Sequence, residues 1–372
     1  MTTIYDVAKA ADVSASTVSR VLNKRGAVDP TLAGRVHAAV AALHYRPNSI
    51  ARNLRLQSTS VIALIISDIE NHFFTSMARG LEDVASRAGY SVVLCNADEN
   101  SNKERDYLRV AIDERFAGVI LSPATADTDL SGLRDQGIPV VAIDRELREH
   151  TVDSVLVQTR SAAERATAHL LEHGFVRIAC ITGPSKASTA EQRLAGYRDA
   201  LRRAGVRADR TLARHTDYKE RGGYAAMESL LDGPRPPDAV FVANEQMALG
   251  VVSCLADQSV RIPRDLGLVT FDDPPWAKIV SPPLTAVAQP SYDVGRTAAR
   301  LLLDRVLHRE AAPRTVWLEA ELRVRASSIR PLDPPRAARV AAGEAARRAH
   351  LDRLGIAEGS PATSRSQARA EG

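Results

Sequence analysis

The chain has 372 residues, of which 45% are apolar, and its 49 Lys and Arg residues nearly balance 45 Asp and Glu residues. This length exceeds one ordinary domain, and the apolar content is sufficient for more than one hydrophobic core. The first ten residues contain no apolar leader, and the longest early apolar run, VIALII at 61–66, is far shorter than the roughly 20 residues that span a bilayer. The sequence therefore predicts a multidomain cytoplasmic protein without a membrane segment.

The cysteines point to the same compartment. Cys95, Cys180 and Cys254 are scattered singly over apolar stretches, without a C-x-x-C pair. An odd number cannot pair fully within one chain, so reduced thiols in a core are expected.

Charge is segregated along the chain. Residues 1–60 carry 8 Lys and Arg against 3 Asp and Glu, residues 61–330 carry 34 against 37, and residues 331–372 carry 7 against 5. A small basic head on a slightly acidic body indicates a local surface for a polyanion. A basic, solvated terminal helix is the alternative.

Three short helices are predicted in the basic head. The first covers TIYDVAKAA, and the second, SASTVSRVL, begins at a Ser14 N-cap. The third follows Asp29 and Pro30, an N-cap with proline at the first helical position, and its apolar residues Leu32, Val36, Val40 and Leu43 recur at helical spacing. These helices predict a compact unit over residues 1–46, followed by a hinge helix and linker over 47–60.

From residue 61 onward, apolar runs alternate with amphipathic helical stretches. The runs are VIALII, SVVLC, GVILS, PVVAI, VRIACIT, AVFVA and LGLVTF. Continuous apolar runs separated by helices favour parallel strands covered on both faces, and residues 61–330 are enough for two doubly wound parallel-sheet subdomains. The Ala- and Arg-rich tail, 331–372, is predicted to be disordered, with a short helix as the alternative.

The first two helices have the spacing of a helix-turn-helix. Ser16 and Arg20 lie one turn apart on one face with Ala15 beside them, so these residues can reach base edges, while Thr17 and Ser19 suit phosphate oxygens. Arg20 can donate two hydrogen bonds to guanine, and the Ala15 methyl can contact thymine. Taken alone, the stretch is more typical of a capped helix whose Ser and Arg side chains face solvent.

The wider sequence resembles the lactose/galactose repressor family of bacterial transcription regulators. The resemblance rests on TIYDVAKAADVSASTVSRVLN, YRPNSIARNL, GLEDVASRAGYSVVLCNAD, RLAGYRDAL, VFVANEQMALG and FDD with PPLTAVAQP, in order over about residues 3–328. It implies a DNA-binding repressor of a pseudo-palindromic double-stranded operator, a homodimer, and a small-molecule effector that alters operator affinity.

The resemblance assigns roles in DNA binding. It places Ala15, Ser16 and Arg20 at base-reading positions, and it places Tyr5, Ser14, Thr17, Ser19 and Asn23 at backbone-contacting positions. It also makes Leu54, with Ala51 beside it, a wedge that enters the minor groove and bends the DNA. The third helix departs from the family pattern, since Leu32 and Ala33 replace polar positions and Gly34 lies inside the helix.

The body resembles periplasmic sugar-binding proteins, in which two lobes close on a ligand. Loops that follow strands are where such folds bind ligands. The candidates for effector binding are Asn71, His72, Phe73, Asp144, Arg145, Arg193, Tyr218, Asn244, Asp272 and Trp276. Carboxylates, arginines and aromatic faces suit a polyol, so a carbohydrate is expected. Two departures, Glu245 for a usual Asp and Gln158–Thr159 for a common Asp-Asn pair, leave the ligand's identity open.

Other readings are weaker or stay open. HLLEH at 169–173 matches a zinc-peptidase string, yet neither a metal site nor a cofactor is expected, and the sequence has no Ser elbow or Walker loop. The chain is therefore not expected to be an enzyme.

A pure solute-binding protein would need an export signal and no reading helix. An activator or global regulator of the same family, responding to a protein partner or a purine, remains an alternative, and a dimer is preferred over a tetramer.

Overall fold

The computed structural model describes residues 2–22, 28–45, 59–148, 151–308 and 312–330. The N-terminal unit contains α1 (Ile4–Ala11), α2 (Ala15–Leu22) and α3 (Pro30–Ala42). Both predicted N-caps, Ser14 and Asp29, are present, and a further cap precedes α1. Thr3 forms a capping box with Asp6 at the start of α1, Ser14 accepts a hydrogen bond from the backbone N–H of Thr17, and Asp29 accepts from the N–H groups of Thr31 and Leu32.

The three helices enclose a small core of their own. Val7, Val18 and Val36, one from each helix, are fully buried. Leu32 and Ala33 are both half-buried, and of these two Ala33 packs against this core.

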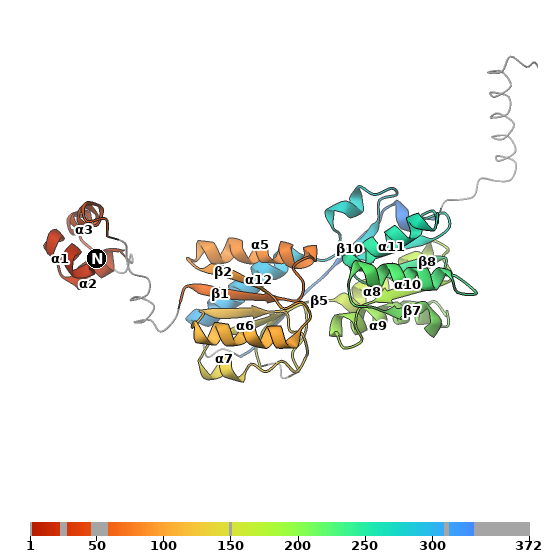
Figure 1. The fold of residues 1–372 in the computed structure, drawn as a ribbon, viewed down its shortest axis with the longest axis horizontal. Coiled ribbons are helices and arrows are strands. Elements are labelled where there is room, and N and C mark those ends of the chain that lie inside the picture. The colour runs from red at the N-terminus through yellow and green to blue at the C-terminus, as the bar shows by residue number, and fades with distance from the viewer. Residues whose placement is uncertain (1, 23–27, 46–58, 149–150, 309–311, 331–372) are drawn as a thin grey trace, which may run out of the picture.

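Residues 59–330 form two lobes, each built on a six-stranded sheet (Figure 1). The N-terminal lobe has the strand order β11-β5-β4-β3-β1-β2, and the C-terminal lobe has the order β12-β10-β9-β8-β6-β7. Paired strands run parallel except β10 and β12. The strands are β1 (Val61–Ile66), β2 (Ser91–Asn96), β3 (Gly118–Leu121), β4 (Val140–Ile143), β5 (Asp153–Val157), β6 (Ile178–Thr182), β7 (Ala213–His215), β8 (Ala239–Val242), β9 (Gly267–Phe271), β10 (Thr285–Ala288), β11 (Thr315–Leu318) and β12 (Glu321–Arg323).

Helices cover both faces of each sheet, as expected for doubly wound subdomains (Figure 1). In the N-terminal lobe α5 packs on α12, and α6 with α7 lies on the other face; in the C-terminal lobe the pairs are α8 with α9 and α10 with α11. The helices are α5 (His72–Arg87), α6 (Ser101–Asp113), α7 (Ser131–Asp135), α8 (Thr159–Glu172), α9 (Ser188–Arg203), α10 (Glu220–Leu231), α11 (Glu245–Asp257) and α12 (Ser291–Leu307). Among the described residues, no helix is both long and apolar enough to cross a membrane.

The chain passes between the lobes three times. It leaves the N-terminal lobe after β5, returns after β10 to form α12 and β11, and leaves again to form β12. The lobes are thus joined by three short segments that lie close together in Figure 1. Such a connection lets two rigid bodies rotate about a common hinge.

All seven predicted strands are confirmed, and the sequence analysis missed β5, β7, β10, β11 and β12. Three of these are edge strands of three or four residues with half-exposed side chains, so they lack a continuous apolar run. The two strands at the lobe crossings, β5 and β10, are fully buried but short.

Candidate functional site

Hydroxyl groups form a network at the start of α2. The Ser14 Oγ lies 2.7 Å from the Ser16 Oγ and 2.9 Å from the Thr17 Oγ1. The turn before it is held by Arg35 of α3, which binds the backbone oxygen of Asp12 at 2.9 Å and its carboxylate at 3.0 Å. Arg35 therefore ties the turn between α1 and α2 to α3.

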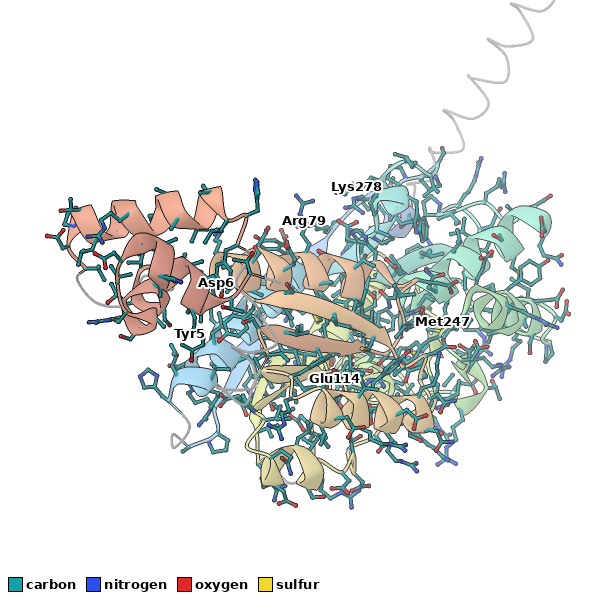
Figure 2. All side chains as sticks on the ribbon, turned by 60° about the vertical axis from the view of Figure 1, so that its left-hand side comes forward. Tyr5, Asp6, Arg79, Glu114, Met247 and Lys278 are labelled. Atoms are coloured by element: carbon teal, nitrogen blue, oxygen red, sulfur yellow. The ribbon has the colours of Figure 1, made fainter. Side chains whose placement is uncertain are left out.

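The residues predicted to contact DNA differ in exposure. Ser14, Ser16 and Arg20 are exposed, and Tyr5 is 74% exposed on the outer surface of α1 (Figure 2). Thr17 and Ser19 are half-buried, as is Ala15, which packs against the three-helix core. Arg20 and Ser16 thus dominate the surface that α2 presents. The predicted contacts at Asn23, Ala51 and Leu54 lie outside the described residues, as do most of the hinge and the tail.

A cleft lies between the two lobes, where the carboxyl ends of their strands face each other, and about 450 Å³ of space, which includes open solvent, lies among its lining residues. The cleft is lined by Asp68, Asn71, Phe73, Phe74, Glu99, Asp144, Arg145, Thr189, Arg193, Asp217, Tyr218, Lys219, Asn244, Asp272 and Gln289. Eight of the ten residues predicted to bind an effector are in this set.

Arg145 follows β4 and is held by carboxylates on its own lobe. Its two terminal nitrogens bind the two oxygens of Glu99 at 2.8 and 2.5 Å, and its Nε lies 3.5 Å from Asp144. Arg145 is 5% exposed. Burial acts to lower its pKa, but the neighbouring carboxylates of Glu99 and Asp144 outweigh this effect and raise the pKa above its ordinary value. A bidentate pair of this kind fixes the plane of the Arg145 guanidinium at the wall of the cleft.

Arg193 of α9 occupies the corresponding place in the C-terminal lobe. Its Nη1 donates to the backbone oxygen of Ala243 at 2.6 Å, and its guanidinium carbon lies 3.9 Å from the centre of the Phe271 ring. Stacking and hydrogen bonding together fix the plane of the guanidinium.

Two buried aspartates, Asp144 and Asp272, complete the polar centre of the cleft. Both adopt a left-handed backbone, with φ of 66° and 71°, which is costly for a non-glycine residue and is frequent at ligand sites. Gln289 donates to Asp272 at 2.7 Å. Burial raises the pKa of each aspartate, and Arg193 acts against this change at both.

Tyr218 closes one wall of the cleft and also has a positive φ, 64°. Its hydroxyl lies 3.2 Å from Thr189 Oγ1, and burial raises the pKa of its phenol. A Cβ atom at Gly183 would lie 2.1 Å from the ring, so only glycine allows the tyrosine this position.

Several buried polar atoms at the cleft have no hydrogen-bond partner within the described part of the chain. They are Arg145 Nε, Arg193 Nε, Glu245 Oε2 and Gln289 Oε1. Unsatisfied buried groups are uncommon in folded proteins and indicate a place that a ligand or water fills.

Polar contacts between the lobes lie beside the cleft. Lys219, which precedes α10, binds Asp68 after β1 at 2.9 Å, and Gln246 of α11 donates to the backbone oxygen of Glu70 at 2.9 Å. Glu245 accepts a hydrogen bond from the backbone N–H of His72.

Two predicted effector residues do not line the cleft. The His72 side chain lies instead on a surface depression with Arg79 and Asp83, and its backbone N–H binds Glu245 of the opposite lobe. Trp276 packs half-buried on the core from a 3₁₀ turn at Pro275–Lys278. Its stacking role is not supported by this position.

Two further residues differ from or clarify the sequence interpretation. The side chain of Asp273, directly after Asp272, is buried and is bound by Arg323 and Arg325, each at 2.8 Å. In the HLLEH stretch, His169 shares a 2.7 Å hydrogen bond with Ser328, and its ring is tilted by 46° relative to the ring of His173. In the described ranges no group of three or more potential ligands could hold a metal ion.

The sequence analysis missed seven residues of the cleft. Asp68, Glu99, Asp217, Lys219 and Gln289 follow strands, so the strand-end rule that found Asp144 could have found the first two, after the predicted runs VIALII and SVVLC. The other three follow β7 and β10, which were themselves missed. Phe74 and Thr189 lie in first helical turns and carry no comparable signal.

Comparison with known proteins follows the same division of the chain. Residues 3–48 match the model for bacterial regulatory proteins of the lacI family, and residues 167–328 match a periplasmic binding protein-like domain. The chain is 39% identical to the ribose operon repressor of Halalkalibacterium halodurans over 82% of this chain and 91% of the relative. It is 32% identical to the transcriptional repressor PurR of Photobacterium profundum over 88% and 98% of the two chains. The structure of the lac repressor dimer bound to operator and the anti-inducer ONPF matches with a TM-score of 0.77 and 25% identity, covering 88% of this chain and 99% of that one.

Proposed function

The chain belongs to the lacI family of bacterial regulatory proteins and is a DNA-binding transcription regulator, and we propose that it is a repressor whose operator affinity is set by an uncharged sugar bound between its lobes. The observation that carries this proposal is the pairing of Arg193 and Asp272 across from Arg145 and Asp144. Each lobe contributes one buried arginine and one buried aspartate to the same cleft. Sugar hydroxyls both donate and accept, so they match such alternating groups.

The charge of the cleft favours a neutral ligand. Five carboxylates line it, from Asp68, Glu99, Asp144, Asp217 and Asp272, against three cationic side chains. The cations Arg145 and Lys219 are already bound to carboxylates. An anionic sugar phosphate would meet excess negative charge, whereas a neutral polyol would not.

The cleft also has an apolar side. Phe73 and Phe74 lie at its edge and contact each other edge to face, with ring centres 5.1 Å apart. An aromatic face covers the apolar side of a sugar ring, but it equally suits a purine base, and a relative of this chain is named PurR. A purine is therefore the second candidate ligand.

The proposed mechanism couples the cleft to DNA through lobe rotation. Because three short segments join the lobes, a ligand that binds the closed form better shifts the population toward closure. That rotation would change the placement of the hinge segment around Leu54 and the fraction of molecules able to bend DNA. Residues 1–46, 47–60, 61–330 and 331–372 serve in this proposal as reading head, hinge, effector core and tail.

We propose a cytoplasmic homodimer as the active form. One head reads only a few base pairs, so a two-fold symmetric pair of heads on a pseudo-palindromic operator is needed for useful affinity. The solved lac repressor structure that resembles this chain is a dimer bound to operator.

A thermal stabilisation screen of the full-length protein tests the ligand class. We expect a neutral pentose or hexose to raise the melting temperature, and the corresponding sugar phosphate to have a smaller effect. Stabilisation by guanine or hypoxanthine alone would replace the sugar with a purine. A ligand that stabilises the protein must also change its affinity for operator DNA, measured by fluorescence anisotropy, or the effector role is wrong.

A further inference from the structure

Glu245 joins the two lobes directly. It is the first residue of α11 in the C-terminal lobe, and its Oε1 accepts a hydrogen bond of 2.5 Å from the backbone N–H of His72, the first residue of α5 in the N-terminal lobe. Backbone N–H groups at a helix start have no partner within the helix. Glu245 therefore satisfies, from the opposite lobe, a donor that α5 cannot satisfy itself.

We propose that Glu245 is a positioning residue that latches the lobes and carries a proton when the cleft is closed, so that closure takes up a proton from solvent. The link to operator affinity rests on the function proposed above, whereas the latch itself does not.

The geometry of the carboxyl group favours this proton. Glu245 is 3% exposed, and its Oε2 is buried without a hydrogen-bond partner among the described residues. A buried carboxylate with one unsatisfied oxygen is unfavourable, and protonation of that oxygen removes the charge while Oε1 can still accept from His72.

The surrounding charges act in the same direction. Asp68 after β1 and Asp272 after β9 face Glu245, and the nearby cations are engaged elsewhere: Lys219 binds Asp68, and Arg193 is held by Ala243 and Phe271. Burial and the charge of Asp272 raise the pKa of Glu245 to about 8, and the hydrogen bond from His72 acts against them.

The sign of the pH effect follows from linkage. In an open cleft the carboxyl faces water, with the ordinary pKa near 4.5, so the closed form binds the proton more tightly. The stabilisation of the closed form by this proton is fully present below the pKa of Glu245 in the open form. It is lost as pH rises through the pKa of Glu245 in the closed form, about 8. Between these values the closing equilibrium falls by up to about tenfold per pH unit.

Hydrogen exchange of the apo, full-length protein tests the latch without any ligand. The peptide that contains the His72 amide is followed at pH 7 and pH 9, with rates corrected for intrinsic exchange. In the wild type, we expect its protection to fall roughly tenfold between these pH values. Glu245→Gln is nearly isosteric and cannot titrate, so its protection should change by less than about twofold.

Two matched variants separate other causes. Glu228→Gln removes an exposed carboxylate of α10 and should leave the wild-type pH dependence unchanged. His72→Gln keeps the backbone N–H, so it should also keep that dependence; loss of the dependence would assign the titration to the imidazole and overturn the proposal. Protection independent of pH in the wild type, or a pH dependence that persists in Glu245→Gln, would overturn it as well.

Glu245→Asp tests the reach of the side chain, since a carboxylate one methylene shorter should no longer meet His72. We expect lower protection of the His72 peptide at both pH values, with an unchanged far-ultraviolet circular dichroism spectrum. Unchanged protection would exclude a latch at this residue. D-ribose, added as a probe, then tests the proposed function separately: an intact latch with no response to any sugar would refute the effector assignment and not the latch.

Discussion

The guanidinium carbon of Arg193 lies 3.9 Å from the centre of the Phe271 ring, and this stack aims the arginine into the cleft. The same guanidinium donates to Ala243 O at 2.6 Å, while its Nε has no hydrogen-bond partner in the described part of the chain. Two of its contacts therefore set its orientation and leave a donor for a ligand.

We expect Arg193→Lys to abolish most ligand binding while the fold is kept. Lysine retains the charge but has no planar group to stack and donate at once, so a loss of roughly 2 kcal/mol of binding free energy is expected. The measurement is thermal stabilisation by the ligand that stabilises the wild type, followed by titration calorimetry. Arg198→Lys, on an exposed position of the same helix, is the control and should bind normally. If both variants bound the ligand with equal affinity, Arg193 would not contact the ligand.

We expect Lys219→Met to favour the open form. The Lys219 ammonium binds Asp68 at 2.9 Å and lies 3.5 Å from Glu70 and 3.6 Å from Asp98, all on the opposite lobe. The side chain is 37% exposed, so solvent screening limits the contribution to about 0.2–1 kcal/mol, which corresponds to a loss of ligand affinity of at most about fivefold.

Salt provides the check on this interlobe ion pair. Raising the ionic strength should weaken ligand binding by the wild type and have less effect on Lys219→Met. Arg221→Met, an exposed cation two residues further on, serves as the control. A variant with unchanged affinity and unchanged salt dependence would show that Lys219 does not hold the lobes.

The sequence predicted the architecture better than the details of the cleft. Buried parallel strands produce continuous apolar runs, and Asp144, Asn244 and Asp272 were found because each directly follows such a run. Asn71 was found in the loop that follows the first run. Lys219 follows a three-residue edge strand with no such run, so its place was not visible. His72 and Trp276 were placed in the cleft by proximity in sequence, which does not determine where a side chain points.

Contacts between the lobes could not be predicted at all. The hydrogen bond from His72 to Glu245 joins residues 173 positions apart, and the reach of the Glu245 carboxyl depends on how the lobes meet. The sequence analysis noted only that Glu245 is a departure from the family's usual Asp. The contact between Glu245 and His72 became visible only when the structure placed the first residues of α11 and α5 next to each other.

We expect Arg20→Ala to relax base preference at one position of each operator half-site. Arg20 is exposed on α2 next to Ser16, whereas Ala15 is half-buried against the core, so direct reading depends mostly on the arginine. The cost should be about 1–3 kcal/mol on the preferred sequence and smaller on sequences altered at that base pair. Arg20→Lys keeps the charge without the two-pronged donor and should also lose selectivity. Binding selections on randomised operators measure this; an unaltered preference in Arg20→Ala would mean that another residue reads the base.

We expect Gly34→Ala to stabilise the N-terminal unit. Gly34 lies inside α3, and a Cβ atom there would meet nothing within 4 Å, so alanine adds no steric conflict. Alanine is favoured over glycine within a helix by about 1 kcal/mol, because the unfolded glycine chain has more conformations to lose. Hydrogen-exchange protection of α3 amides in the full-length protein should rise roughly fivefold.

We expect the same substitution at Gly250, Gly250→Ala, to destabilise the protein. At Gly250 in α11 a Cβ atom would lie 1.9 Å from the backbone oxygen of Glu220, where α10 and α11 pack closely. Helix propensity favours alanine here too, but the overlap with backbone must push the helices apart, so the C-terminal lobe should lose about 1–3 kcal/mol of stability. Calorimetry of the two variants separates packing from propensity. Destabilisation by Gly34→Ala would contradict this prediction and would mean that a partner occupies the space beside α3. Hydrogen-exchange protection of α3 measured with and without operator DNA would show whether that partner is the DNA duplex.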